Sequence, residues 1–212
     1  MNITEHILDE VEVEQWQMKE MLSAILHTIL FLRAPGPSRP TEVAMERFDK
    51  SYVTCGAEDI SRAVEESIDG LCEGLSEEPT GALEPAGPEL WKGCMVLSFF
   101  EKRSIPQLFG LVNNEEKVVW EQWRIPVLIS TTPRPMGDDT ASVIERQRQA
   151  QQAEAMLQAR MMQIFEFANG HFDHLPPVAY EFEISFGRKS PGEKREAVYA
   201  RIMQAPPLIN LS

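Results

Sequence analysis

The first long apolar pattern along the chain has the spacing of a helix. Apolar side chains recur three or four residues apart at Met18, Leu22, Ile25, Ile29 and Leu32. This spacing places them in one stripe along a helix that packs against a core. The segment APGPSRP follows Arg33, and its three prolines cannot continue the helix. The pattern therefore predicts a helix over residues 14–33.

Two later stretches repeat the helical spacing. Residues 58–75 carry the apolar row Ile60, Val64, Ile68, Leu71 and Leu75. Residues 138–169 carry the row Val143, Ala150, Ala153, Leu157, Met161, Ile164 and Ala168. The first half of this longer helix, ERQRQAQQAEA, is polar and favoured mainly by intrinsic propensity. It forms either a solvated face or a face that meets a partner.

Other segments have the composition and alternation of strands. Residues 94–101, CMVLSFFE, and residues 118–131 are strongly apolar, and YVTC at 52–55 is a shorter candidate. Residues 180–186 alternate aromatic or aliphatic side chains with Glu and Ser. About a dozen residues separate the first two segments, so the simplest prediction is an antiparallel hairpin with a long loop.

The second strand of this hairpin has two unusual features. Trp120 and Trp123 lie three residues apart, so we expect them on opposite faces of the sheet. Either both pack inside the protein, or the outer one meets a helix or a partner. Pro126 cannot donate to a strand ladder, so we expect it at an edge or at a bulge.

The order of these elements indicates the fold class. Helices and strands are mixed without regular βαβ alternation, which favours an α+β fold with a sheet covered by helices. The Pro-, Gly- and Glu-rich stretch around residues 76–90 is expected to be a mobile loop, and residues from about 188 a loose tail. A length of 212 residues fits one large domain or two small ones.

Composition and charge exclude several classes. Apolar residues make up 43% of the chain, enough for a substantial core. The net charge of −13 makes nucleic acid a poor partner. The acidic start MNITEHILDEVEVE lacks the features of a secretory signal, and the apolar run 29–32 is too short to span a bilayer. Three widely spaced cysteines without a CxxC indicate neither a zinc site nor a disulfide framework. We therefore expect a cytoplasmic protein.

Histidines provide the main candidate chemistry. His171, Asp173 and His174 form a local cluster, HFDH, that could belong to a small metal-dependent hydrolase or simply to a polar turn. His27 lies beside the apolar stripe of the first helix and is expected to be a hydrogen-bonded packing residue. No phosphate loop, nucleophile elbow or zincin motif is present. We expect no catalytic residues, no bound metal and no cofactor.

The loop of the predicted hairpin carries the segment LFGL at residues 108–111. Loops are usually polar because their backbones face water. One explanation is that the tip folds back, or that the strands extend further than expected. The other is an apolar finger that inserts into another protein, since large aromatic and aliphatic anchors often dominate such contacts.

Several segments, in order, resemble the autophagy-related protein 101 family, and we expect a fungal member. They are AILHTILFLR at 24–33, RFDKSYV at 47–53, LSFFEKR at 97–103, VVWEQW at 118–123 and NGHFDHLPP at 169–177. The resemblance implies a single HORMA domain over residues 1–212, a mainly antiparallel sheet packed with three main helices, and no catalysis.

The same resemblance implies partners and a site. Members bind and stabilise the HORMA domain of autophagy-related protein 13. They act as scaffolds in the kinase complex that initiates autophagosome formation, at the phagophore assembly site. They carry a finger, an exposed Trp and Phe on this hairpin loop, that recruits downstream autophagy factors. Pro106, Leu108, Phe109 and Gly110 occupy the finger loop here, with Leu108 at the position of the family Trp. The alternative is a HORMA-type peptide-binding adaptor outside autophagy, in chromatin or checkpoint control.

Overall fold

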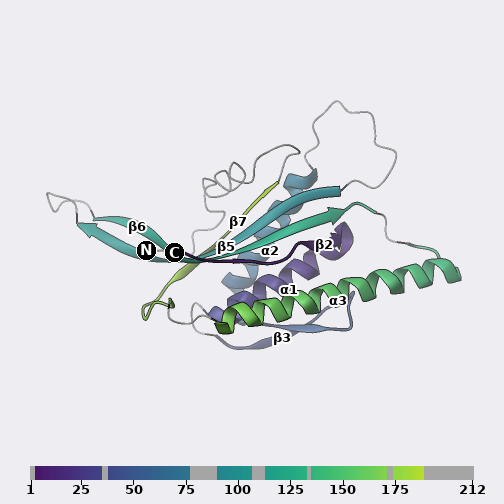
Figure 1. Cartoon of the computed structure of the whole chain (residues 1–212), viewed down its shortest axis with the longest axis horizontal. Coiled ribbons are helices and arrows are strands. Elements are labelled where there is room, and N and C mark those ends of the chain that lie inside the picture. The colour runs from purple at the N-terminus through teal and green to yellow at the C-terminus, as the bar shows by residue number, and fades with distance from the viewer. Residues whose placement is uncertain are drawn as a thin grey trace, which may run out of the picture.

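A five-stranded sheet with helices packed on one of its faces forms the centre of the protein, seen in the computed structural model of Figure 1. The structure describes residues 3–34, 38–76, 90–106, 113–132, 135–170 and 174–188. Its elements, in chain order, are β1 (Thr4–Ile7), β2 (Val11–Glu14), α1 (Gln15–Arg33), β3 (Thr41–Ala44), β4 (Ser51–Thr54), α2 (Glu58–Ser76), β5 (Leu90–Pro106), β6 (Asn113–Ser130), α3 (Thr140–Gly170) and β7 (Glu181–Arg188).

The main sheet is built around the β5–β6 hairpin. β7 pairs antiparallel with β5 on one side, and the short strands β1 and β2 pair parallel with β6 on the other. β3 and β4 form a separate two-stranded antiparallel hairpin. The predicted α+β class, with a mainly antiparallel sheet and three main helices, is confirmed for the described residues.

The core lies between the sheet and the three helices. Alternate residues of β5, β6 and β7 are buried in one cluster with residues of α1, α2 and α3. α1 contacts both other helices and is buried on most sides, because it is apolar around much of its circumference. It ends at Ala34, in the left-handed conformation with φ 35°, whose N–H donates to Leu30 O. None of the helices in the described residues is both long enough and apolar enough to cross a membrane.

The helices and the strands β4 and β7 match the sequence predictions within a few residues, but both hairpin strands are longer than predicted. β5 continues to Pro106 and β6 starts at Asn113, so the strands take up part of the expected loop. β1, β2 and β3, of four residues each, were not predicted. The expected loop at 76–90 and the tail from 188 lie almost entirely outside the described residues.

The prediction that Trp120 and Trp123 lie on opposite faces is wrong. Phe99 pairs with Glu121, while Phe100 pairs with Val119, so a β-bulge leaves Trp120 as an extra residue on β6. The extra residue shifts the alternation by one. Both tryptophans are therefore buried in the same core cluster.

Pro126 lies neither at an edge of the sheet nor at this bulge. It pairs with Cys94 inside the β5–β6 ladder. On its other side, β1 pairs with β6 only as far as Arg124, and β2 pairs from Val127 onward. The proline therefore occupies the gap between two short parallel strands, where a missing N–H costs no ladder bond.

Candidate partner-binding site

The outer part of the β5–β6 hairpin projects beyond the sheet as a two-stranded arm (Figure 1). We use the name arm for Glu101–Pro106 paired with Asn113–Val118. β7 pairs with β5 only up to Phe100, and β1 pairs with β6 only from Glu121. Among the described residues, the arm strands therefore pair only with each other. Six paired residues at about 3.3 Å each make an arm on the order of 20 Å long.

The predicted finger residues belong to the tip of this arm. Pro106 pairs with Asn113 as the last rung of the ladder. The six residues 107–112 connect these two positions in the chain, and they include Leu108, Phe109 and Gly110. These three lie outside the described residues, so the finger itself remains a prediction. The part that is described shows that the loop is shorter than the predicted dozen residues.

Charged side chains attach the inner end of the arm to β7. Lys102 and Lys117 face each other across the ladder, where two like charges would repel. Each finds a carboxylate on β7: Lys102 Nζ lies 2.9 Å from Glu181 Oε1, and Lys117 Nζ lies 2.8 Å from Glu183 Oε2. Lys117 also lies over the Phe100 ring, 4.7 Å from its centroid. These two ion pairs connect the inner end of the arm to β7.

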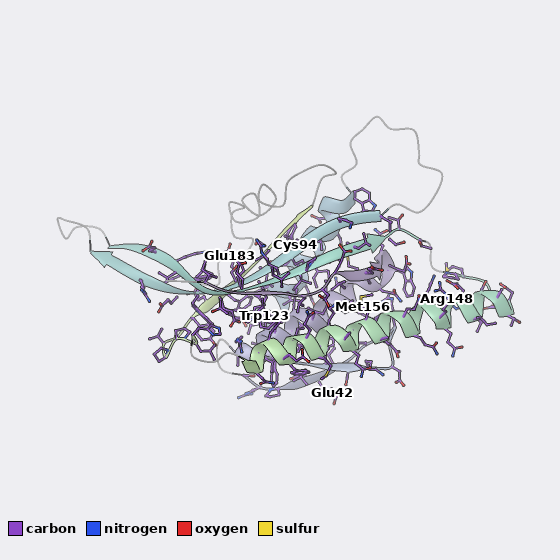
Figure 2. The ribbon with its side chains drawn as sticks, viewed as in Figure 1. Glu42, Cys94, Trp123, Arg148, Met156 and Glu183 are labelled. Atoms are coloured by element: carbon purple, nitrogen blue, oxygen red, sulfur yellow. The ribbon has the colours of Figure 1, made fainter. Side chains whose placement is uncertain are left out.

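A buried ionic group, which we call the Glu121 cluster, lies just inside the bulge at the root of the arm. Arg33 Nε lies 2.9 Å from Glu121 Oε1, and Arg33 Nη2 donates to Oε2 at 3.0 Å. Both side chains are almost completely inaccessible to solvent. Trp123 Nε1 and His174 Nε2 also hydrogen-bond to the carboxylate, and His6 Nε2 lies 3.7 Å from it. Trp123 is labelled in Figure 2, in the interior beneath the sheet.

The cluster joins elements that are distant in the sequence. Arg33 ends α1, His6 belongs to β1, and His174 lies in the turn before β7. Arg33 Nη1 also donates to Ala168 O near the end of α3, and Tyr180 donates its hydroxyl hydrogen to Arg33 O. These contacts hold β6, where the arm begins, against α1, α3, β1 and the β7 turn. The geometry indicates a structural role for Glu121 as an anchor of the root.

The surroundings keep the buried carboxylate ionised. Burial by itself raises the pKa of Glu121, but the neighbouring His6, hydrogen bonds from Arg33 and His174 and the Arg33 charge lower its pKa to about 2. The paired guanidinium supplies the compensating charge that a buried carboxylate requires. Loss of either partner would leave an isolated charge in the core.

His6, Glu121 and His174 are also the one group in the described part of the chain whose ligand atoms could converge on a metal ion, all within 4.8 Å of one another. Two histidines and a carboxylate match an open zinc site in ligand type. However, the Arg33 guanidinium already contacts both carboxylate oxygens, and a second cation there would add uncompensated charge to the core. The residues therefore do not fit a metal.

The hydrolase alternative based on HFDH gains no support from this arrangement. His171 and Asp173 lie outside the described residues, whereas His174 joins the Glu121 cluster. Sequence analysis missed this cluster because its members come together only through the fold. His27, predicted to be a hydrogen-bonded packing residue, is buried and stacks on Tyr52 at 5.7 Å, but its Nδ1 has no hydrogen-bond partner in the part of the chain that the structure describes. Burial lowers the pKa of His27 to about 4.

A second surface feature is an apolar groove between α1, the β3–β4 hairpin and α3. The groove encloses about 560 Å³ and is lined by apolar side chains that include Phe31, Leu32, Tyr52 and Met161. Val53 and Phe165 at the groove are 36% and 41% exposed. A hollow of this composition is suited to an apolar partner surface.

Comparison with known proteins identifies the family of the chain. The family model described as autophagy-related protein 101 matches residues 10–181. A relative of that name from Arabidopsis thaliana is 30% identical, with 93% of this chain and 94% of the relative covered. Relatives of the same name from Homo sapiens and Xenopus laevis are each 24% identical, covering 87% of this chain and 80% of their own length. The expected fungal origin stays a prediction. The chain belongs to the autophagy-related protein 101 family.

Proposed function

We propose that this chain is a non-enzymatic adaptor of the autophagy-initiation kinase complex. In this proposal it binds and stabilises the HORMA domain of autophagy-related protein 13, and it recruits downstream autophagy factors through the loop at the tip of the arm. A role in autophagy follows from family membership. The partners, the complex and the action at the phagophore assembly site are the parts proposed here.

The projecting arm is the observation that carries the proposal. Its strands pair only with each other among the described residues, and its inner end is attached to β7 by two ion pairs. A two-stranded ribbon of this kind has little stability of its own. An arm that projects beyond the sheet is therefore more easily explained by a function than by a contribution to stability. The apolar loop sequence LFGL at its tip supplies one, because a partner could bury these side chains.

The finger of this chain differs from the family pattern at one position. Leu108 stands where the family has Trp, while Phe109 matches the family Phe. Leucine keeps an apolar contact but lacks the ring area and the indole N–H donor of tryptophan. The proposal therefore includes a downstream partner whose pocket for this residue is apolar and needs no hydrogen bond.

The apolar groove is the proposed contact surface for the partner HORMA domain. Val53 and Phe165 would be removed from water when the partner covers the groove, which favours association. The groove is formed by α1, β3–β4 and α3, in the layer below the sheet, whereas the arm projects beyond the end of the sheet (Figure 1). Binding at the two surfaces should therefore be separable by mutation.

Affinity purification from cells that lack the endogenous chain tests both surfaces together. The finger variant Leu108→Asp/Phe109→Asp should retain autophagy-related protein 13 and lose downstream factors. The groove variant Phe165→Asp should lose autophagy-related protein 13, because an unpaired carboxylate would be buried in an apolar interface.

The matched control is Asn113→Asp/Asn114→Asp, which adds the same two charges beside the loop without touching the apolar residues. It should behave as the wild type in both respects. If the finger variant still recovers every partner, the loop does not recruit the downstream factors. If the groove variant still recovers every partner, the groove is not the contact surface for autophagy-related protein 13.

A further inference from the structure

A second hollow lies on the opposite side of α3 from the apolar groove, where the helix faces β2. It encloses about 420 Å³ between β2, the start of α1, the paired ends of β5 and β6, and the first half of α3. We call it the β2–α3 pocket. Met156, labelled in Figure 2, lies on the side of α3 that faces the sheet, and its sulfur accepts the backbone N–H of Glu12 at 3.2 Å. The pocket therefore lies next to β2, a strand at the edge of the sheet, and α3 covers part of that strand.

Three polar atoms of residues that line this pocket are buried and have no hydrogen-bond partner among the described residues. They are Gln17 Nε2, Glu14 Oε2 and Gln149 Oε1. Gln17 is 2% exposed. Gln149 uses its other side-chain atom, Nε2, to donate to Glu145 Oε1 at 3.1 Å. A buried polar group without a partner costs about 1–3 kcal/mol, so a ligand that supplied partners to these three atoms would be stabilised in this pocket.

The charge of the pocket indicates what would bind. Glu12 and Glu14 contribute negative charge, and no lysine or arginine lines the pocket. Arg148, on the same part of α3, attracts the Glu14 carboxylate, but its own hydrogen bonds go to Glu145, from Nε at 2.8 Å, and to Gln152, from Nη1 at 2.9 Å. The Glu14 carboxylate therefore feels the Arg148 charge but forms no ion pair with a lysine or arginine of the described residues.

We propose that the β2–α3 pocket binds an arginine side chain presented by a segment of a partner protein. Glu14 and Gln149 offer two oxygen acceptors, which suit the several donors of a planar guanidinium. Gln17 offers an N–H donor for a main-chain carbonyl of the same segment. Leu128 and Met156 supply apolar wall for the aliphatic stem of the arginine. A lysine would use one acceptor well but would not match two at once.

This site is distinct from the finger and from the apolar groove. Its lining residues come from β2, the start of α1, the polar first half of α3 and the ends of β5 and β6 that are farthest from the arm along these strands. The sequence left two explanations for the polar first half of α3, a face exposed to solvent or a face that meets a partner. The pocket assigns part of it, around Gln149 and Gln152, to a partner.

The test is a titration of the full-length, ¹⁵N-labelled chain with the capped peptide Ala-Arg-Ala, followed by NMR. The side-chain amide signals of Gln17 and Gln149 should shift and saturate. The same peptide with citrulline, which keeps the shape of arginine but has no charge, should bind at least about tenfold more weakly. Equal binding of the two peptides, or no shift at Gln17, would overturn the proposal.

Two variants with the same change of charge locate the effect. Glu14→Gln should weaken binding of the arginine peptide about tenfold or more, whereas Glu10→Gln, outside the pocket, should change it less than about twofold. Glu10 is a fair control because it lies on the same segment and pairs with Lys92 at 3.6 Å. Equal effects of the two variants would mean that the acidic surface attracts the peptide without a site.

The chain also carries cations of its own that must be excluded as the ligand. Lys194, Arg195 and Arg201 belong to the C-terminal residues outside the described structure. Replacing all three by glutamine in the full chain should leave the Gln17 and Gln149 signals unchanged. If the signals move and added peptide then binds more tightly, the pocket takes this chain's own tail, and the partner proposal is wrong.

Discussion

The two ends of the arm differ in what surrounds them. At its root, Glu121 is fully buried and bound by Arg33 of α1, by Trp123 of β6 itself and by His174 of the turn before β7. Toward its tip, the two strands pair only with each other among the described residues. The residues at the root are therefore constrained by their contribution to the stability of the protein. The outer strands of the arm gain no pairing from the rest of the described sheet, so we expect changes at the tip to affect stability little.

The largest effect expected from this difference is at the root. Glu121→Ala removes the partner of a buried guanidinium and leaves hydrogen-bond donors of Trp123 and His174 unpaired. We expect a loss of about 3–5 kcal/mol in the free energy of unfolding, measured by urea denaturation. Glu183→Ala breaks an exposed ion pair with Lys117 instead and should cost at most about 1 kcal/mol. Similar losses for the two variants would contradict the account of the root.

Acid should weaken the root in a predictable direction. The pKa of Glu121 in the folded protein is about 2, below the ordinary value of 4.5. Its contribution is therefore complete above pH 4.5 and is lost as the pH falls from 4.5 toward 2. Between pH 6 and pH 3, the difference in unfolding free energy between wild type and Glu121→Gln should shrink by roughly 2 kcal/mol. A difference that is constant over this range would show that Glu121 is not held ionised by its neighbours.

A smaller effect is expected where the arm meets β7. Lys117→Met keeps an unbranched stem over the Phe100 ring but removes the ammonium group from that ring and from Glu183. The expected loss is about 0.5–1.5 kcal/mol, because the pair is partly exposed. The control is Lys50→Met, which breaks an exposed ion pair with Glu154 at 3.8 Å. The difference between the two losses in unfolding free energy, measured by urea denaturation, gives the contribution of the contact between Lys117 and Phe100. Equal losses would mean that the cation–π contact adds nothing.

The smallest effect on stability is expected at the tip. Leu108→Asp/Phe109→Asp should change the free energy of unfolding by less than about 0.5 kcal/mol, as surface substitutions away from packed features usually do. Thermal and urea unfolding of the purified variant would measure this. A loss above about 2 kcal/mol would mean that the tip packs within the protein, and the finger would then have to be abandoned.

Periodicity alone was enough to predict the helices and the hairpin. The apolar stripes of α1, α2 and the second half of α3 are long, and β7 alternates cleanly. β1 and β2 escaped prediction because strands of four residues carry too few positions to establish a period, although VEVE at 11–14 does alternate. The bulge at Trp120 could not be foreseen either, since it arises from the pairing of two strands rather than from either strand alone.

The sequence contained weak signals for the Glu121 cluster. Glu121 lies between two tryptophans in an apolar strand, and Arg33 ends an apolar helix. Charged residues in such positions are seldom buried unless they are paired. What the sequence could not supply was the pairing, because 88 positions separate the two residues and only the fold brings them together. The finger, by contrast, was one of two explanations for the apolar loop sequence, was favoured by the resemblance, and is still a prediction.

The measurement that tests the account most directly is size-exclusion chromatography with light scattering on the purified chain and the HORMA domain of autophagy-related protein 13 from the same organism. The wild type and Leu108→Asp/Phe109→Asp should both form a one-to-one complex, and each complex should melt at a higher temperature than the free chain. If the wild-type chain stays monomeric with this partner at micromolar concentrations, the adaptor proposal is wrong. If only the double variant fails to bind, the tip of the arm belongs to the dimer interface and is not a separate surface.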